Sequence, residues 1–174
     1  MTDDVFLGLE HVALTVPDIT EAEVFFEKAF GATILFRAKT KDEDPITGPE
    51  MNPINDLAME SAVKAITMIR IGSGPNIELF EVENTGRKDQ PRFEDQGYHH
   101  ICIYCRDMQE AIAKLKAAGA EILKGPIDGG GPEEGPGNQS QFCKTPWGLI
   151  IEFNHMPSPM HYAKEATQTR YFPD

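Results

Sequence analysis

The sequence has no apolar run that approaches the roughly 20 residues a helix needs to span a bilayer. Its N-terminus, MTDDVFLGLEH, lacks the basic segment and long apolar stretch of a secretory signal peptide. Positive charge is also scarce, because 16 Lys and Arg stand against 28 Asp and Glu, which gives a formal net charge of −12. That charge repels phosphate backbones and anionic membranes, so we expect no nucleic-acid partner and no membrane partner.

Cysteine is scarce as well, with Cys102, Cys105 and Cys143 only. An odd number of cysteines without a leader segment indicates reduced thiols and a cytoplasmic location. The C-x-x-C spacing of Cys102 and Cys105 is typical of zinc or redox sites. These two cysteines lie in the alternating segment HICIYC, however, and residues three apart on a strand point to opposite faces. We therefore interpret both as small, buried apolar residues.

What the sequence does contain is an internal repeat. Residues 11–18, HVALTVPD, and residues 100–107, HICIYCRD, both begin with His, alternate apolar positions and reach Asp seven residues later. In both copies a Glu follows that Asp after three residues, which predicts the N-terminus of a helix. A helical apolar stripe, a glycine and several β-prone runs follow in both, and the copies end alike on IELF and IEFN.

Each copy thus predicts a strand, a helix and then three strands. We assign a first βαβββ module to residues 7–84, a linker to 85–96, a second βαβββ module to 97–156 and a C-terminal tail to 157–174. The predicted fold class is α+β, with the two modules pairing into a curved mixed sheet that encloses a metal-binding cleft. The first copy is longer by an insert at residues 39–65, in which NDLAMESAV predicts a short helix.

One His and one Glu recur at equivalent positions of the two copies, His11 with Glu78 and His100 with Glu152. Strand alternation places all four opposite the apolar faces that would pack against the helices. Two imidazoles and two carboxylates form a mixed ligand set suited to Ni, Co, Zn, Mn or Fe, and buried carboxylates need a cation to offset their charge. We predict that these four residues hold one divalent metal ion. The alternative is a metal-free cleft whose polar groups satisfy one another.

Four protein ligands leave two positions of an octahedron for water or substrate oxygens, which predicts a catalytic site. Residues that share strand faces with the predicted ligands are candidates for contact with a small-molecule substrate, namely Asn76, Phe80, Tyr104 and Asn154. His99 has the wrong parity for a ligand. We place it on the other face of its strand or in a supporting position behind a ligand.

The segments EHVALTVPD, HHICIYCRD, NIELFEVEN and TPWGLIIEFNHMP resemble the strand motifs of the vicinal oxygen chelate superfamily, which includes glyoxalase I, methylmalonyl-CoA epimerase, extradiol dioxygenases and bleomycin-binding proteins. In this resemblance His11 and His100 match the histidines that open each module, and Glu78 and Glu152 match the carboxylates of each last strand. Having all four looks most like bacterial glyoxalase I, since the epimerases often have Gln where this chain has Glu78. The resemblance also implies a homodimer.

The activity implied is that of a metal-dependent isomerase, epimerase or lyase, which abstracts a proton beside a carbonyl of a small organic substrate, with Glu152 or Glu78 as the catalytic base. Two alternatives stay open, an Fe(II)-dependent extradiol-type dioxygenase and a non-catalytic protein that binds an antibiotic or toxin. The insert and the tail differ from standard glyoxalase I, which counts against a glutathione conjugate as substrate. The tail either closes over the cleft or packs outside it.

Overall fold

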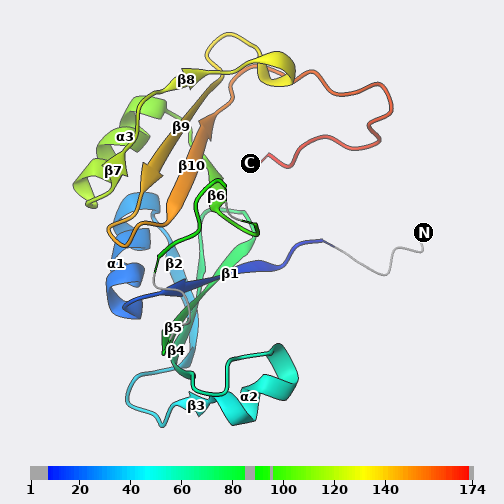
Figure 1. The fold of residues 1–174 in the computed structure, drawn as a ribbon. Coiled ribbons are helices and arrows are strands. Elements are labelled where there is room, and N and C mark those ends of the chain that lie inside the picture. The colour runs from blue at the N-terminus through cyan, green and yellow to red at the C-terminus, as the bar shows by residue number, and fades with distance from the viewer. Residues whose placement is uncertain (1–7, 85–88, 95, 173–174) are drawn as a thin grey trace. The chain divides into compact units, whose positions relative to one another are not determined.

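The computed structural model describes residues 8–84, 89–94 and 96–172, which form two compact units (Figure 1). Along the chain, the division between the units falls within the predicted linker. Residues 85–88 and 95 of that linker lie outside the described residues, as does residue 7 of the first predicted module. Each unit contains its own five-stranded sheet. The predicted α+β class with two repeated modules is therefore confirmed, while the predicted module boundaries stay a prediction.

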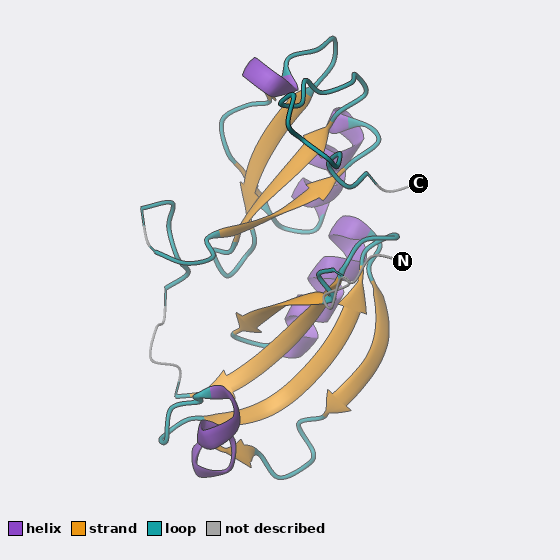
Figure 2. Cartoon of the chain, turned by 90° about the vertical axis from the view of Figure 1, so that its right-hand side faces the viewer, coloured by secondary structure: helices purple, strands orange, loops and turns teal. Residues whose placement is uncertain are grey.

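The first unit consists, in chain order, of β1 (His11–Val16), α1 (Ile19–Phe30), β2 (Thr33–Lys39), β3 (Ile46–Thr47), α2 (Gly48–Asn55), β4 (Ala62–Arg70) and β5 (Asn76–Glu83). Its strand order is β1-β5-β4-β2, with β3 beside β4. The first strand runs parallel to β5, whereas β4 is antiparallel to both of its main neighbours. The sheet is therefore mixed, and α1 covers one of its faces (Figure 2).

The second unit repeats this plan with β6 (His100–Tyr104), α3 (Met108–Ala117), β7 (Glu121–Ile122), β8 (Ile127–Asp128), the 3₁₀ helix η1 (Gly131–Glu133), β9 (Gln139–Lys144) and β10 (Ile150–His155). Its strand order is β6-β10-β9-β7, with β8 beside β9. Here too the first strand is parallel to the last, and the last is antiparallel to the one before it. The sequence repeat is therefore a repeat of topology.

The two main helices begin where the repeated Asp residues predict. The Asp18 side chain accepts a hydrogen bond from the Glu21 backbone N–H at 2.9 Å, and Asp107 accepts one from the Glu110 N–H at 2.8 Å. The first helix ends at Gly31, whose φ of 66° is left-handed and favours glycine. None of the helices in the described part of the chain is long and apolar enough to cross a membrane.

Each unit has an apolar core between its helix and one face of its sheet. In the first unit Phe26 of α1 and Leu79 of β5 are fully buried, and in the second Leu115 of α3 and Ile151 of β10 are. Burial of such side chains contributes roughly 1.5–3 kcal/mol each. Because β-strand side chains alternate, the residues between these apolar positions lie on the opposite face of each sheet.

The prediction of a short helix in NDLAMESAV is wrong. The helix of the insert is α2, seven residues earlier, where Glu50 reaches back to accept hydrogen bonds from the backbone N–H and the hydroxyl of Thr47, both at 2.7 Å. This helix ends at Asp56, whose φ is 62°. Residues 62 and 63 belong to β4, where they pair with β5. The prediction overlooked the Thr47–Glu50 capping box, which starts the helix earlier in the chain. Pairing with β5 outweighed the helical propensity of residues 62 and 63.

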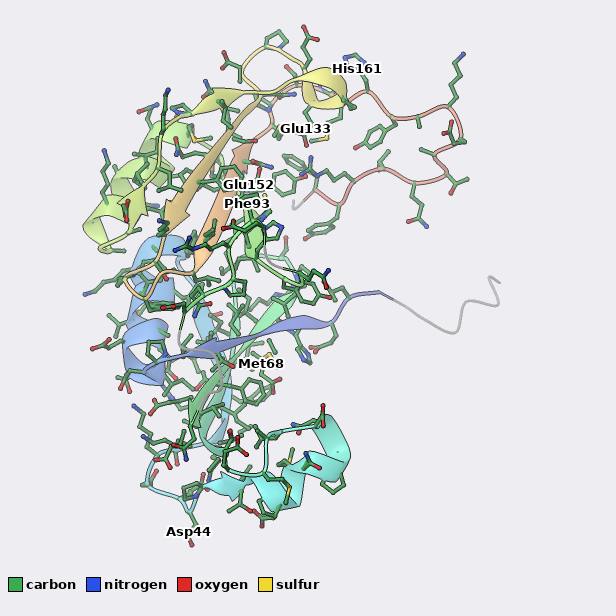
Figure 3. The ribbon with its side chains drawn as sticks, viewed as in Figure 1. Asp44, Met68, Phe93, Glu133, Glu152 and His161 are labelled. Atoms are coloured by element: carbon green, nitrogen blue, oxygen red, sulfur yellow. The ribbon has the colours of Figure 1, made fainter. Side chains whose placement is uncertain are left out.

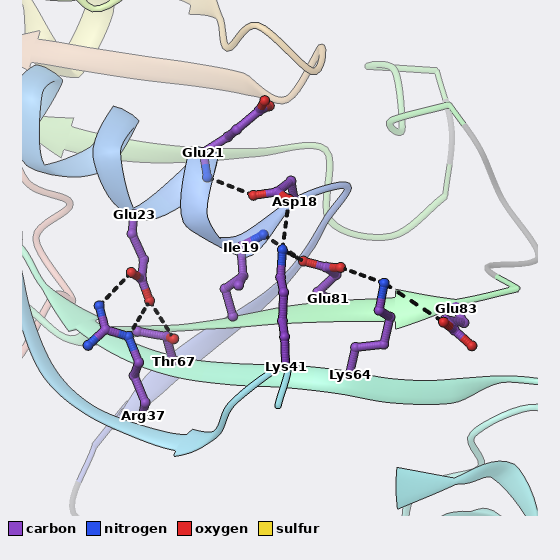
Figure 4. A network of polar contacts seen from close by, with 10 residues as sticks. All are labelled: Asp18, Ile19, Glu21, Glu23, Arg37, Lys41, Lys64, Thr67, Glu81 and Glu83. Atoms are coloured by element: carbon purple, nitrogen blue, oxygen red, sulfur yellow. Dashed lines mark hydrogen bonds and ion pairs between the residues drawn. The ribbon is translucent and has the colours of Figure 1, made fainter. Parts of the chain in front are cut away.

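A polar cluster ties the insert to the start of α1 (Figure 4). Glu81 lies on the helix side of β5 with only 5% of its surface exposed. Its carboxylate accepts a hydrogen bond from the Ile19 backbone N–H at 2.9 Å and pairs with Lys41 at 2.7 Å and Lys64 at 3.0 Å. Lys41 also pairs with Asp18 at 2.7 Å. The cluster thus compensates the buried negative charge of Glu81. In the second unit the corresponding position is His155.

Candidate metal centre and substrate face

The first His–Glu pair lies on the face of its sheet that is opposite the apolar core. In the parallel pairing of β1 with β5, His11 stands opposite Asn76 and Ala13 stands opposite Glu78. This register places Glu78 one alternation beyond His11 on the same face. The Nε2 atom of His11 lies 3.4 Å from Oε2 of Glu78.

The second pair is built in the same way within the second unit. His100 stands opposite Ile150 and Cys102 stands opposite Glu152 in the parallel pairing of β6 with β10. The Nε2 atom of His100 lies 3.3 Å from Oε2 of Glu152. The structure thus brings together the two members of each predicted pair, with the same atoms facing each other.

In each pair, the residue before the histidine contacts the ring nitrogen Nδ1, which does not face the glutamate. His11 Nδ1 forms a hydrogen bond with the Glu10 carboxylate, which raises the pKa of His11, and the other Glu10 oxygen accepts a hydrogen bond from Asn76 at 2.5 Å. His100 Nδ1 lies 2.7 Å from Nδ1 of His99. Metal-binding histidines are commonly oriented by such a bond to the nitrogen that does not bind the metal. His99 is therefore in the supporting position, and Glu10 is its unpredicted counterpart.

The donor chemistry and spacing of the two pairs fit a divalent cation. Two ligand atoms that each lie about 2.1 Å from one ion are about 3–3.5 Å apart, which is the separation of Nε2 and Oε2 in both pairs. Within either unit, the described residues contain no group of three or more His, Cys, Asp or Glu side chains that could hold a metal. Each pair therefore supplies half of the predicted ligand set.

The surroundings of Glu152 correct one prediction from the sequence. Cys102 is exposed on the open face of the sheet, opposite Glu152, so its interpretation as a buried apolar residue is wrong. The same alternation that aligns it with His100 places it on the face that no helix covers. Asn154 is only 1% exposed, and in the amide orientation that satisfies both of its polar atoms it donates to Glu152 Oε1 at 3.2 Å and to Ser140 Oγ at 2.8 Å.

The four predicted substrate residues take different positions around the pairs. Asn76 supports Glu10, and Asn154 supports Glu152. Phe80 lies half-buried on β5, two residues beyond Glu78 on the same face. Tyr104 lies half-buried on β6, two residues beyond Cys102 on the face of His100. Phe80 and Tyr104 thus have partly open side chains beside the predicted ligands, whereas the two asparagines form hydrogen bonds with carboxylates.

Aromatic residues around His100 were not predicted. The Phe93 ring stacks on His100 with centroids 5.3 Å apart, and Phe142 meets His100 edge-on at 5.7 Å. Figure 3 labels Phe93 and Glu152 in this unit. Phe93 comes from the predicted linker, whose sequence has neither strand nor helix periodicity, so no local pattern indicates that its ring lies against His100. The position of Phe142 could be anticipated once β9 is paired with β10, because Phe142 then stands opposite Glu152.

Comparison with known proteins decides the family. The sequence model of the glyoxalase/bleomycin resistance protein/dioxygenase superfamily matches residues 10–136. The chain belongs to this superfamily. A 2-epi-5-epi-valiolone epimerase from Actinomyces sp is 31% identical to it, with 97% of this chain and 90% of that protein covered. The resemblance of the strand motifs is thereby confirmed, and the relative supports an enzyme of the glyoxalase superfamily.

Solved structures of the superfamily share the fold. A glyoxalase family protein from Bacillus cereus superposes with a TM-score of 0.67 at 19% identity, over 89% of this chain and 97% of that one. The trypanothione-dependent glyoxalase I of Leishmania major gives a TM-score of 0.56 at 18% identity, over 87% of this chain and 88% of that one. At these identities the likeness extends to the fold alone.

Proposed function

We propose that the chain is a metal-dependent epimerase that inverts a carbon beside a carbonyl in a small, polyhydroxylated cyclic ketone. The observation that carries the proposal is the repeated His–Glu pair, with Nε2 and Oε2 3.4 Å apart in the first unit and 3.3 Å apart in the second. The relation to 2-epi-5-epi-valiolone epimerase supports the reaction class and this type of substrate. Isomerase and lyase reactions would begin with the same proton abstraction.

In this proposal His11, Glu78, His100 and Glu152 hold one divalent ion of Ni, Co, Zn, Mn or Fe. When bound, the ion supplies Lewis-acid stabilisation of the negative charge that develops on the carbonyl oxygen. The chain itself supplies two imidazoles, whose orientation Glu10 and His99 fix through Nδ1. It also supplies two carboxylates that are only partly buried, so a substrate carbon has access to them.

One of the two carboxylates acts as the base in the proposed reaction. Epimerisation removes the proton next to the carbonyl and returns a proton to the other face of the same carbon. Glu152 Oε1 is held by Asn154 and its Oε2 faces His100, so its oxygens are oriented before substrate arrives. Glu78 has the equivalent contact with His11. The pseudo-symmetry makes both of them candidates, and substitution separates their roles.

The test is proton exchange with solvent. Metal-loaded protein is incubated with 2-epi-5-epi-valiolone in D₂O, and NMR follows loss of the α-proton signal together with appearance of the epimer. Removal of a general base lowers such rates about 10²–10⁴-fold, which we expect for Glu152→Gln or Glu78→Gln but not for Glu83→Gln at the exposed end of β5. If the metal-loaded wild type neither exchanges nor inverts the substrate, the proposed function is wrong.

Two further measurements address the alternatives raised by the sequence. An extradiol-type dioxygenase would consume oxygen with a catechol when loaded with Fe(II), and an epimerase would not. A non-catalytic binder would hold its ligand without a metal, and His11→Ala would leave that binding unchanged.

A cytoplasmic location and a homodimeric state are part of the same proposal. The free thiols of Cys102, Cys105 and Cys143 support a reducing compartment. Fractionation of cells and sedimentation of the purified chain test these two points.

A further inference from the structure

We propose that the C-terminal strap, residues 157–172, forms part of the substrate site and recognises an uncharged, hydroxyl-rich substrate through Tyr104 and Arg170. This inference rests on the proposed function, because it names the substrate class and the specificity residues of the same site.

The strap begins with fixed contacts to the loop around η1. The Ser158 backbone N–H donates to the Asn138 side-chain oxygen at 2.8 Å, and the Ser158 hydroxyl donates to the Pro136 carbonyl at 2.7 Å. The His161 N–H donates to the Pro132 carbonyl at 2.8 Å. Asn138 is almost fully buried, so it fixes the direction in which the chain leaves β10.

The strap then turns back and reaches the sheet. The Arg170 backbone N–H donates to the Tyr162 hydroxyl at 3.1 Å, and the Arg170 guanidinium forms an ion pair with Glu133 of η1. Figure 3 shows Glu133 and His161 on the same side of this unit, where the strap leaves it. The Phe172 ring lies 4.7 Å from the Tyr104 ring, and Arg170 Cζ lies 5.7 Å from the centre of that ring. The end of the strap therefore packs against Tyr104.

Tyr104 connects the strap with the candidate metal ligands. It stands on β6 opposite Asn154, on the face that carries His100 and Glu152. Its hydroxyl oxygen is buried and has no hydrogen-bond partner among the described residues. Leaving such a group unpaired is unfavourable, and an oxygen atom of a bound substrate would supply the missing hydrogen bond. Burial raises the pKa of Tyr104, so its hydroxyl remains a protonated donor at neutral pH.

The charges around Tyr104 favour a neutral substrate. The Arg170 charge is offset by Glu133, and both side chains are 37% exposed, so neither is locked away from a ligand. A guanidinium has five N–H donors, and the ion pair with Glu133 is made through Nη1. An anionic substrate would have to compete with Glu133 for Arg170 while lying on the same face as Glu152. Hydroxyl groups can accept the remaining hydrogen bonds without either cost.

The experiment compares Tyr104→Phe and Arg170→Ala with Lys164→Ala, which removes one positive charge from an exposed position of the same strap. Initial rates with 2-epi-5-epi-valiolone give KM and kcat, and calorimetric titration gives the affinities for that ketone and for its phosphate ester. We expect KM to rise about 10-fold in each of the first two variants, since a lost hydrogen bond is worth about 1.4 kcal/mol, with kcat and metal affinity nearly unchanged. Arg170→Lys, which keeps the charge but not the planar donors, should fall between wild type and Arg170→Ala.

Two results would overturn the inference while the proposed function stands. One is a KM for Tyr104→Phe and Arg170→Ala equal to that of Lys164→Ala. The other is tighter binding of the phosphate ester than of the neutral ketone by the wild type, with that preference lost in Arg170→Ala. If no polyhydroxylated ketone binds at all, both the inference and the proposed substrate are wrong, whereas metal-dependent deuterium exchange into another ketone would leave only the proposed proton abstraction standing. Melting temperatures show whether each variant is folded.

Discussion

The Nδ1 atoms of His99 and His100 lie 2.7 Å apart, so one of the two rings donates a hydrogen bond to the other. This bond leaves Nε2 of His100 directed at Glu152. The Phe93 ring lies against both imidazoles, with its centroid 4.5 Å from that of His99 and 5.3 Å from that of His100. Together the two neighbours restrict rotation of the His100 side chain, which would orient it for the proposed cation.

We predict that His99→Ala weakens divalent metal binding about 10–100-fold, because His100 loses the partner that orients its ring. Competition between the protein and a chromophoric chelator for Co(II) measures the affinity, and the visible spectrum of bound Co(II) reports a change in ligand geometry. Tyr98→Ala is the control, since Tyr98 is 93% exposed and precedes the same pair of histidines. Unchanged affinity and spectrum in His99→Ala would contradict an orienting role.

Glu10 is predicted to do for His11 what His99 does for His100. Glu10→Ala should lower metal affinity about 10–100-fold, because His11 Nδ1 and the Asn76 amide both lose their partner. Glu10→Gln keeps an oxygen that can accept one of these bonds, and we expect a smaller loss. The same Co(II) competition measures both variants. A loss in Glu10→Gln as large as that in Glu10→Ala would mean that the Glu10 charge, rather than its hydrogen bonds, matters.

The pairing of His11 with Glu78 and of His100 with Glu152 could be predicted because the sequence repeats it and because strand alternation is regular. A duplicated sequence predicts equivalent positions, and strand alternation predicts which face each side chain occupies. The register then brings each pair to 3.4 Å or 3.3 Å. The same alternation places Cys102 beside Glu152, so its exposure was predictable from the rule that placed His100 on the open face.

Other parts of the site depend on contacts between distant segments. Phe93 of the linker contacts Phe142 of β9, and Arg170 of the tail contacts Tyr104 of β6. Neither the linker nor the tail has a regular pattern that fixes its path. The burial of Glu81 could be predicted in part, because strand alternation places Glu81 on the apolar face with Ile77 and Leu79. Its partner Lys41 comes from the insert, and only the folded chain brings the two together.

The proposed shared ion predicts the metal stoichiometry. One divalent ion should bind per chain, and His11→Ala and His100→Ala should each reduce its affinity by at least about 100-fold, because each removes one of four ligands. Elemental analysis after dialysis gives the stoichiometry, and His161→Ala in the strap is a control that removes a histidine outside the pairs. Two ions per chain, with one retained in each ligand variant, would contradict a shared site.

The polar cluster around Glu81 predicts a specific loss of stability. Glu81→Gln keeps the size of the side chain but removes the charge that Lys41 and Lys64 share. We expect the free energy of unfolding at pH 7 to fall by about 1–3 kcal/mol, as urea denaturation would measure. Glu83→Gln is the matched control, because Glu83 is 50% exposed and lies 3.8 Å from Lys64, and its effect should stay within about 0.5 kcal/mol.

The stability difference between wild type and Glu81→Gln should depend on pH. Burial by itself raises the pKa of Glu81, but hydrogen bonds from Lys41, the Ile19 N–H and Lys64 outweigh it and hold the pKa below its ordinary value of 4.5. Because the pKa is lower in the folded state than in the unfolded state, the ionised carboxylate stabilises the fold fully above about pH 5, and that contribution is lost as the pH falls below 4.5. Urea denaturation at a series of pH values from 7 down to 3 should therefore show the two proteins converging in stability. A difference that stayed constant across this range would mean that the charge of Glu81 does not contribute, and that the loss in Glu81→Gln comes from altered packing beside α1.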